Sequence, residues 1–339
     1  MYESFYGLTA KPFQLKPDPS FYFGSKGHKR AMAYLEYGLS QGEGFIVITG
    51  EVGAGKTTLV RNLFRELDSD KILAAQIVNT HLNSDDTLRM VAGAFGLPFE
   101  GATKASLLTR VEQFLRQCDM RGQRALLVVD EAQNLSPQTV EELRMLSNFQ
   151  TDDKSLLQTF LLGQPEFRKT LLSPEMLQLR QRVIATYHLG PMDAEETRTY
   201  IEHRLHTVGW SGSPSISDEA FTEIHAFTGG IPRKINTLCD RLFLMGYLEE
   251  LYAFSIAEVQ EVTKDIEREF DVPAEAGQGD LMPLRDFAAA SLVDQPRIDL
   301  DIMDERLSRI ERSVVSVLDA LRKILSSPKM KNQPNEPNP

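Results

Sequence analysis

Five short apolar runs separated by helical patterns constrain the fold of this chain more than any other feature of its sequence. The runs occupy residues 44–50, 72–80, 124–131, 156–164 and 182–190. The segments between them include amphipathic patterns such as KASLLTRVEQFLRQC. Strands that are apolar along most of their length and alternate with helices are typical of a parallel sheet covered on both faces. We therefore predict an α/β fold built on a five-stranded parallel sheet.

The glycine-rich stretch GEVGAGKTT follows the first run and fits the pattern G-x-x-x-x-G-K-[ST] of a P-loop, or Walker A motif. In such a loop the backbone N–H groups surround phosphates, and the following helix adds the positive end of its dipole. Lys56 is placed to reach the β and γ phosphates, and Thr57 offers its hydroxyl to Mg²⁺. We predict that ATP and Mg²⁺ bind here, through Gly50, Glu51, Val52, Gly53, Ala54, Gly55, Lys56, Thr57 and Thr58.

The third apolar run ends in two carboxylates, Asp130 and Glu131. Ligands bind at the carboxyl ends of strands in open parallel sheets, so both side chains should lie beside the loop. Asp130 is suited to the Mg²⁺ shell, and Glu131 to orienting or deprotonating an attacking water. A simple nucleotide switch needs only Asp130, so Glu131 favours hydrolysis. The alternative is that Glu131 is only a charged residue at the start of a helix.

Three further polar residues precede or follow the last two strands. Gln164 ends the fourth run, where it either touches the γ-phosphate or the water, or is a solvated loop residue. Arg180 and Arg182 stand just before the fifth run. An arginine delivered to a γ-phosphate by a neighbouring subunit accelerates hydrolysis by several orders of magnitude. Arginine pairs at helix ends are more often exposed to solvent, so the sequence leaves their role open.

After residue 190 the pattern changes to helices alone. Asp193 with Glu196, Ser217, and Ser255 with Glu258 have the residue types of helix starts. The predicted domains are a nucleotide-binding core with an N-terminal aromatic segment, a helical lid, a linker, a coiled-coil-like helix and a disordered tail. Their boundaries are 1–190, 191–269, 270–297, 298–326 and 327–339.

The stretch TGGIPRKIN lies within the lid. Gly229 and Gly230 are suited to ending one helix, and Pro232 to the first turn of the next. Arg233 then lies at the N-terminal end of that helix, where the lid would face the phosphates. A plain turn accounts for the glycines and the proline, whereas a nucleotide sensor also accounts for the arginine.

An apolar seam with alternating spacings of three and four residues predicts a coiled-coil helix near the C-terminus. This helix either docks back on the body of the protein, or associates with a second copy or a partner helix. The seam consists of Leu300, Met303, Leu307, Ile310, Val314, Val317, Leu321 and Ile324.

The first 23 residues are rich in aromatic side chains. Aromatics can stack on the bases of single-stranded nucleic acid, but only Lys11 and Lys16 accompany them here. We expect these rings to pack onto the core beside the adenine pocket. His28 is a weaker candidate for contact with the base, and we expect His203 and His206 to lie on a solvated helix face. The rings belong to Tyr2, Phe5, Tyr6, Phe13, Phe21, Tyr22 and Phe23.

Charge and composition limit the classes of molecule that this protein can bind and where it acts. A formal net charge of -11 over 339 residues argues against nucleic acid as a partner, because the chain as a whole repels phosphate backbones. Cys118 and Cys239 have no metal-ligand spacing and are expected to be small buried side chains. No window approaches 18 uninterrupted apolar residues, so we expect a cytoplasmic protein that reaches the inner membrane only through partners.

Taken together, the motifs GEVGAGKTT, LLVVDEAQNL, LLGQPEF, LRQRV and GGIPRKINTLCDR resemble those of AAA+ ATPases. More narrowly, residues 1–270 resemble the ATPases related to the general secretion pathway component A, and most of all the branch associated with PEP-CTERM/exosortase and exopolysaccharide gene clusters. The resemblance implies the strand order 5-1-4-3-2 and a site between core and lid. It also implies roles for Gln164 as sensor 1, Arg233 as sensor 2, and Arg182 or Arg180 as an arginine finger.

The function implied by this resemblance is that of an ATP-hydrolysing switch or assembly factor. It would act as a homo-oligomer, with ATP at subunit interfaces, on proteins of a cell-envelope secretion or exopolysaccharide system. One alternative is a DNA-dependent regulatory ATPase of the transposition or initiator type. Another is a scaffold that does not hydrolyse ATP and is held together by its C-terminal helix.

Overall fold

The structure is a computed structural model that describes residues 1–270, apart from residues 17, 79–83 and 153. The described residues belong to one unit that extends from Met1 to Pro273. The predicted linker from residue 271 onward, the coiled-coil seam and the tail lie outside the described residues.

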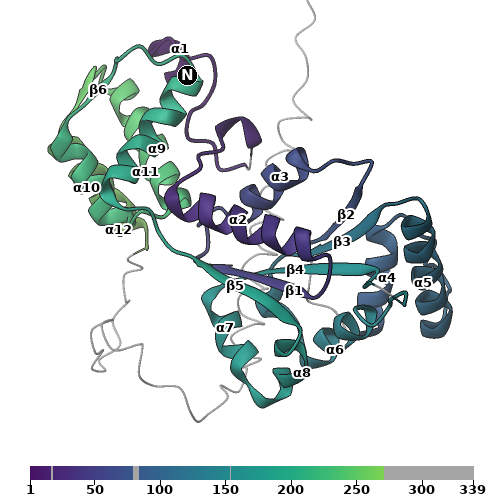
Figure 1. Ribbon diagram of the computed structural model, residues 1–339. Helices are drawn as coiled ribbons and strands as arrows, with labels where there is room; N and C mark the ends of the chain where they lie inside the picture. Colours follow the sequence, from purple (N-terminus) through teal and green to yellow (C-terminus); the bar gives the residue numbers. More distant parts are fainter. Residues whose placement is uncertain (17, 79–83, 153, 271–339) are drawn as a thin grey trace, which may run out of the picture. The chain divides into compact units, whose positions relative to one another are not determined.

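A five-stranded parallel sheet forms the centre of the core (Figure 1). The strand order β2-β3-β4-β1-β5, read from the other edge, is the order 5-1-4-3-2 that the family resemblance implied. The predicted fold class is therefore confirmed. Because the five strands are parallel, the loop that follows β1 lies at the carboxyl edge of the sheet, together with the ends of β3 and β4. The strands are β1 Phe45–Gly50, β2 Ile72–Ile77, β3 Arg124–Val129, β4 Leu157–Gly163 and β5 Val183–Leu189.

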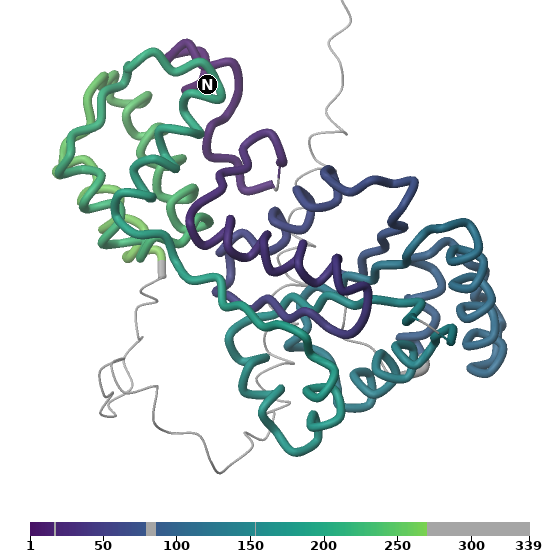
Figure 2. Tube along the Cα trace, in the orientation of Figure 1, coloured from purple at the N-terminus to yellow at the C-terminus, as the bar shows by residue number. Residues whose placement is uncertain are grey.

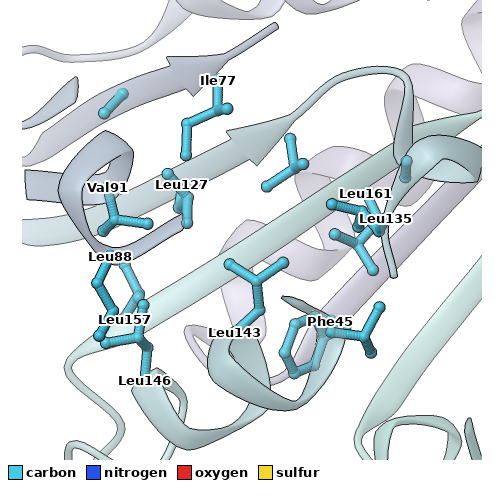
Figure 3. Close-up of a cluster of buried hydrophobic side chains, with 14 of the residues drawn as sticks. Phe45, Ile77, Leu88, Val91, Leu127, Leu135, Leu143, Leu146, Leu157 and Leu161 are labelled. Atoms are coloured by element: carbon cyan, nitrogen blue, oxygen red, sulfur yellow. The ribbon is translucent and has the colours of Figure 1, made fainter. Parts of the chain in front are cut away.

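Alternate residues of strands β1 to β4 face opposite layers of helices. Phe45 and Val47 point into one apolar cluster, and Ile46 and Ile48 into the other. The first cluster packs under helices α4 to α8, and Figure 3 shows part of it. The second packs under α2 and α3. The helices are α2 Lys26–Gln41, α3 Lys56–Glu66, α4 Ser84–Ala94, α5 Lys104–Met120, α6 Pro137–Leu146, α7 Pro165–Leu172 and α8 Leu177–Arg180.

The lid follows β5 and contains four helices. All three predicted helix starts are present: Asp193 forms a capping box with Glu196, Ser217 caps the second helix, and Ser255 bonds Glu258 before the last. The lid departs from helices alone only by a pair of two-residue parallel strands, β6 Ser215–Ile216 and β7 Ala253–Phe254. The helices are α9 Ala194–Thr207, α10 Asp218–Thr228, α11 Pro232–Leu248 and α12 Ile256–Phe270.

Six of the seven aromatic rings of the N-terminal segment pack with the lid, which corrects the prediction that the segment packs onto the core, and only Tyr22 packs against the core cluster under α2 and α3. Tyr2, Tyr6 and Phe13 are buried in the same apolar cluster as Phe243 of α11. The Tyr2 hydroxyl also donates to Asp240 Oδ1 at 2.6 Å. Figure 2 shows this purple segment, which includes the short helix α1 Tyr2–Phe5, beside the green lid helices. A small four-helix lid buries little apolar surface alone, and the aromatic rings enlarge its core.

The environments of the two cysteines and of two lid histidines can be compared with their predictions. Cys118 and Cys239 are buried free thiols, as predicted, and burial raises the pKa of both. His203 was expected on a solvated face, but it is half-buried with its ring 5.6 Å from that of Phe23. His206 is exposed and lies against Trp210.

Candidate nucleotide-binding site

A cavity of about 240 Å³ is lined by residues of the core, the lid and the N-terminal segment. The core contributes Val52, Gly53 and Gly55 to Thr58 from the glycine-rich loop, with Glu131 and Gln164 from the strand ends. The lid contributes Met192, Tyr200, Arg204, Pro232, Arg233 and Asn236. The N-terminal segment and the start of α2 contribute Gln14, Leu15, Lys16, Asp18, Phe21, Tyr22, Phe23 and His28. Lys56, Glu131, Gln164 and Arg233, which the sequence motifs singled out, thus line one cavity together with residues such as Tyr200 and Arg204 that no motif predicted.

The glycine-rich loop joins β1 to α3 as its sequence predicts. Gly55 begins the helix with a φ of 97°, which L side chains rarely adopt. Lys56 follows and is buried, with its Nζ donating to the carbonyls of Gly50 at 2.6 Å and Glu51 at 3.0 Å. Burial lowers the pKa of this ammonium, although the nearby carboxylates of Glu131 and Asp130 oppose the shift. The ammonium therefore lies inside the curve of the loop, where it can meet a phosphate.

Asp130 and Thr57 supply the oxygen atoms that a magnesium site requires. The Thr57 hydroxyl donates to Asp130 Oδ2 at 2.8 Å, and the N–H of Glu131 donates to Asp130 Oδ1 at 3.0 Å. The Asp130 side chain is only 2% exposed, and its burial raises the pKa of the carboxyl group. A buried carboxylate paired with a hydroxyl suits a hard divalent cation such as Mg²⁺. This pair therefore fits the metal that the motif implies.

Glu131 is held in place by two glutamine side chains. Its Oε2 accepts from Gln133 Nε2 at 2.6 Å and from Gln164 Nε2 at 3.4 Å. Gln133 Oε1 in turn accepts from the N–H of Gln164 at 2.9 Å, so it joins the ends of β3 and β4. Glu131 also has a φ of 55°, an uncommon conformation for a residue other than glycine, and one that clusters at functional sites. Gln133 was not a predicted site residue, although its place two residues after Glu131 could have suggested one.

Arg233 meets the loop directly from the lid. It lies in the first turn of α11, and its N–H donates to the carbonyl of Gly53 at 3.2 Å. A Cβ added to Gly53 would lie 2.3 Å from the Cβ of Arg233, so only glycine permits this approach. Gly229 ends α10 in the left-handed conformation that the sequence predicted. The exposed Arg233 side chain therefore borders both the loop and the cavity.

His28 takes a larger part in the site than its sequence suggested. Its ring Nδ1 lies 2.7 Å from the Ser25 hydroxyl, and its Nε2 lies 2.7 Å from the position a Gly55 Cβ would occupy. The side chain is buried, and this burial lowers its pKa, which favours a neutral ring. The imidazole thus supports the glycine-rich loop from α2. No local motif marks it, because Ser25 and His28 precede β1.

The two predicted arginine-finger candidates, Arg180 and Arg182, lie apart from the residues that line the cavity. Arg182 donates to the Ser147 hydroxyl at 2.6 Å and to the side chain of Asn148. Arg180 donates to the carbonyls of Leu171 at 3.3 Å and Leu172 at 3.2 Å. Neither arginine lines the cavity that the described residues of its own chain form.

The fold and the loop place this protein in a known structural class. Residues 39–171 match the family described as AAA domain. Two solved structures with the same fold are the Aeropyrum pernix ORC2 protein in its ADPNP–ADP complexes and the A. pernix ORC1 protein in complex with DNA. Their TM-scores are 0.57 and 0.56, at 16% and 18% identity, covering 75% and 76% of this chain and 71% and 70% of theirs. Residues 39–171 therefore resemble an AAA domain, and the chain has the AAA+ P-loop fold.

A more specific likeness is to the general secretion pathway protein A of Aeromonas hydrophila. The two sequences are 39% identical over 248 residues, which is 73% of this chain and 45% of that protein. This chain thus spans less than half the length of its curated relative. Among the described residues, no helix is both long enough and apolar enough to cross a membrane.

Proposed function

We propose that the chain binds and hydrolyses ATP with Mg²⁺ in the cavity between core and lid. The observation that supports this proposal best is the position of Glu131. Its carboxylate borders the cavity and is fixed by Gln133 and Gln164. A general base must be held near the water that it activates, and two amide donors provide that constraint. A protein that only senses bound nucleotide has no need for this second carboxylate beside Asp130.

The remaining residues divide the other tasks among them. Lys56 and the loop N–H groups would bind the phosphates, while Thr57 and Asp130 would hold Mg²⁺, whose charge offsets that of the phosphates. Gln164 would orient the water together with Glu131. Arg233 would act as the lid's sensor of the γ-phosphate, because its backbone N–H already bonds the carbonyl of Gly53.

We also propose that hydrolysis is completed by a second copy of the chain. Arg182 lies outside the cavity of its own subunit, where Ser147 and the side chain of Asn148 hold its guanidinium. In this proposal the guanidinium leaves Ser147 and Asn148 to reach the nucleotide of a neighbouring subunit. Arg180 is the second candidate, although carbonyls at the end of α7 accept its hydrogen bonds.

For the biological task, we propose a switch or assembly ATPase that serves a cell-envelope secretion system. The identity to general secretion pathway protein A supports this role. We propose exopolysaccharide export as the more particular setting, on the motif resemblance described above. In this proposal the protein is cytoplasmic and reaches the inner membrane through its partners.

The substitution Glu131→Gln tests the proposed chemistry. It keeps the shape of the side chain but removes the base, so turnover should fall by about a hundredfold or more while ATP binding persists. The matched control is Glu219→Gln, which removes the same charge from an exposed residue in the first turn of α10. Steady-state phosphate release and equilibrium ATP binding are the measurements. Undiminished hydrolysis by Glu131→Gln would refute the role of Glu131.

The same assay separates the proposed function from a DNA-dependent one. Turnover of the wild type should be unchanged by added duplex or single-stranded DNA, in keeping with the net charge of -11. Strong stimulation by DNA that declines steeply with salt would replace the secretion role with a regulatory role on DNA.

A further inference from the structure

Three buried polar side chains form part of the lid wall of the cavity. They are Tyr200 and Arg204 on α9 and Asn236 on α11, and each is 6% exposed. All three line the cavity. Polar groups buried to this extent need partners, and the directions of their hydrogen bonds show what they offer to a ligand.

Arg204 fixes the direction of the network, because a guanidinium can only donate. Its Nε donates to the carbonyl of Pro12 at 2.5 Å, and one terminal nitrogen donates to the carbonyl of Gln14 at 3.3 Å. The other terminal nitrogen donates to the Tyr200 hydroxyl at 2.8 Å. The Phe21 ring lies beneath the guanidinium, 4.7 Å away. The N-terminal segment thus holds Arg204 in one orientation, and the Tyr200 oxygen acts as its acceptor.

Because the Tyr200 oxygen accepts from Arg204, its hydroxyl proton is directed to Asn236. Its hydroxyl donates to Asn236 Oδ1 at 2.9 Å. If the amide were reversed, Arg204 and Asn236 would both donate to the same hydroxyl, and the hydroxyl proton would lose its acceptor. That arrangement is costly for a buried group. The network therefore fixes the orientation of the Asn236 amide, with its oxygen accepting from Tyr200 and its amino group available as a donor to the cavity.

We propose that Asn236 reads the base of the bound nucleotide by donating a hydrogen bond from Nδ2 to a purine ring nitrogen. This inference rests on the proposed function, since it requires the phosphates to lie at the Lys56 end of the cavity. The aromatic side chains of Phe21, Tyr22 and Phe23 line the cavity too and supply the apolar surface that a base needs. A ribose hydroxyl can both donate and accept, so it gains little from a donor of fixed direction. A ring nitrogen only accepts.

Atom-by-atom analogues of ATP test this proposal. The full-length wild type is titrated with ATP and with 1-deaza-, 3-deaza- and 7-deaza-ATP, each of which replaces one ring nitrogen by C–H. One analogue should bind roughly tenfold more weakly than ATP, the size expected from losing one hydrogen bond to a buried donor. Equal affinity for ATP and all three analogues would overturn the proposal, whatever the variants do.

Two variants assign the effect to Asn236 and its support. In Asn236→Ala, ATP should bind as weakly as the weakest-binding deaza analogue binds to the wild type. The variant should also bind ATP and that analogue with equal affinity. Tyr200→Phe should reduce the discrimination, because the amide is then free to turn over. An unchanged ratio of affinities for ATP and that analogue, in an Asn236→Ala protein with native circular dichroism, would contradict the assignment of the contact to Asn236.

These readouts are separate from the test of hydrolysis. Binding of ATP without discrimination would leave the proposed function standing and overturn only the inference about Asn236. Failure of the wild type to bind any of the four nucleotides would overturn both. Loss of turnover in Glu131→Gln has no bearing on the analogue ratios.

Discussion

The two walls of the cavity are built in different ways. The core wall takes its side chains from segments that directly follow strands, and each lies within a short motif. The lid wall joins residues distant in the sequence: Arg204 bonds the carbonyl of Pro12 across a separation of 192 residues. The phosphate end of the site therefore depends mainly on the loop and on the ends of parallel strands, to which His28 and Arg233 add contacts. The end assigned to the base depends on the docking of the N-terminal segment.

The largest expected effect compares two buried phenylalanines. Phe13 lies in the lid cluster and Phe160 in the sheet, and they are 1% and 0% exposed. Replacing either by alanine should cost about 3–5 kcal/mol of stability. The Phe160→Ala loss should appear in the unfolding of the sheet, whereas Phe13→Ala should loosen the lid helices selectively, as measured by hydrogen exchange. If Phe13→Ala left exchange in α11 unchanged, the N-terminal segment would not be part of the lid core.

A smaller effect is expected from Arg233, which stands where the two walls meet. Arg233→Ala should weaken ATP binding by between about ten- and a hundredfold, the range expected for a charge-assisted hydrogen bond. The melting temperature without nucleotide should not change, because the side chain is exposed. The matched control is Lys234→Ala, the next residue, which is exposed and does not line the cavity that the described residues form. If both variants lost ATP affinity equally, Arg233 would act only through its positive charge and not through a specific contact with the nucleotide.

Most of the core wall could be predicted from the sequence. The apolar runs fix the strands, and a glycine-rich pattern directly after a strand defines the loop with Lys56 and Thr57. Asp130 and Glu131 follow from their place at a strand end. The loop–helix geometry and the bond between Thr57 and Asp130 agree with those expectations. Interactions of this kind are determined within a few residues, or by the order of parallel strands.

Apart from Arg233, the lid wall could not be predicted in this way. The aromatic segment has no periodicity that shows which of two apolar cores it joins, and the choice follows from contacts such as Tyr2 with Asp240. Arg204 looks like any charged residue of an amphipathic helix until the carbonyls of Pro12 and Gln14 are brought to it. His28 likewise acquires its role only when α2 packs beside Gly55.

The central claim is that one nucleotide contacts both walls at once. Hydrogen exchange of the Glu131→Gln variant, with and without Mg²⁺ and ATP, tests it most directly. We expect slower exchange in the loop at residues 50–58 and, in the same sample, at residues 12–23 and 228–236. Protection confined to residues 50–58 would contradict the account, because the lid and the N-terminal segment would then take no part in binding.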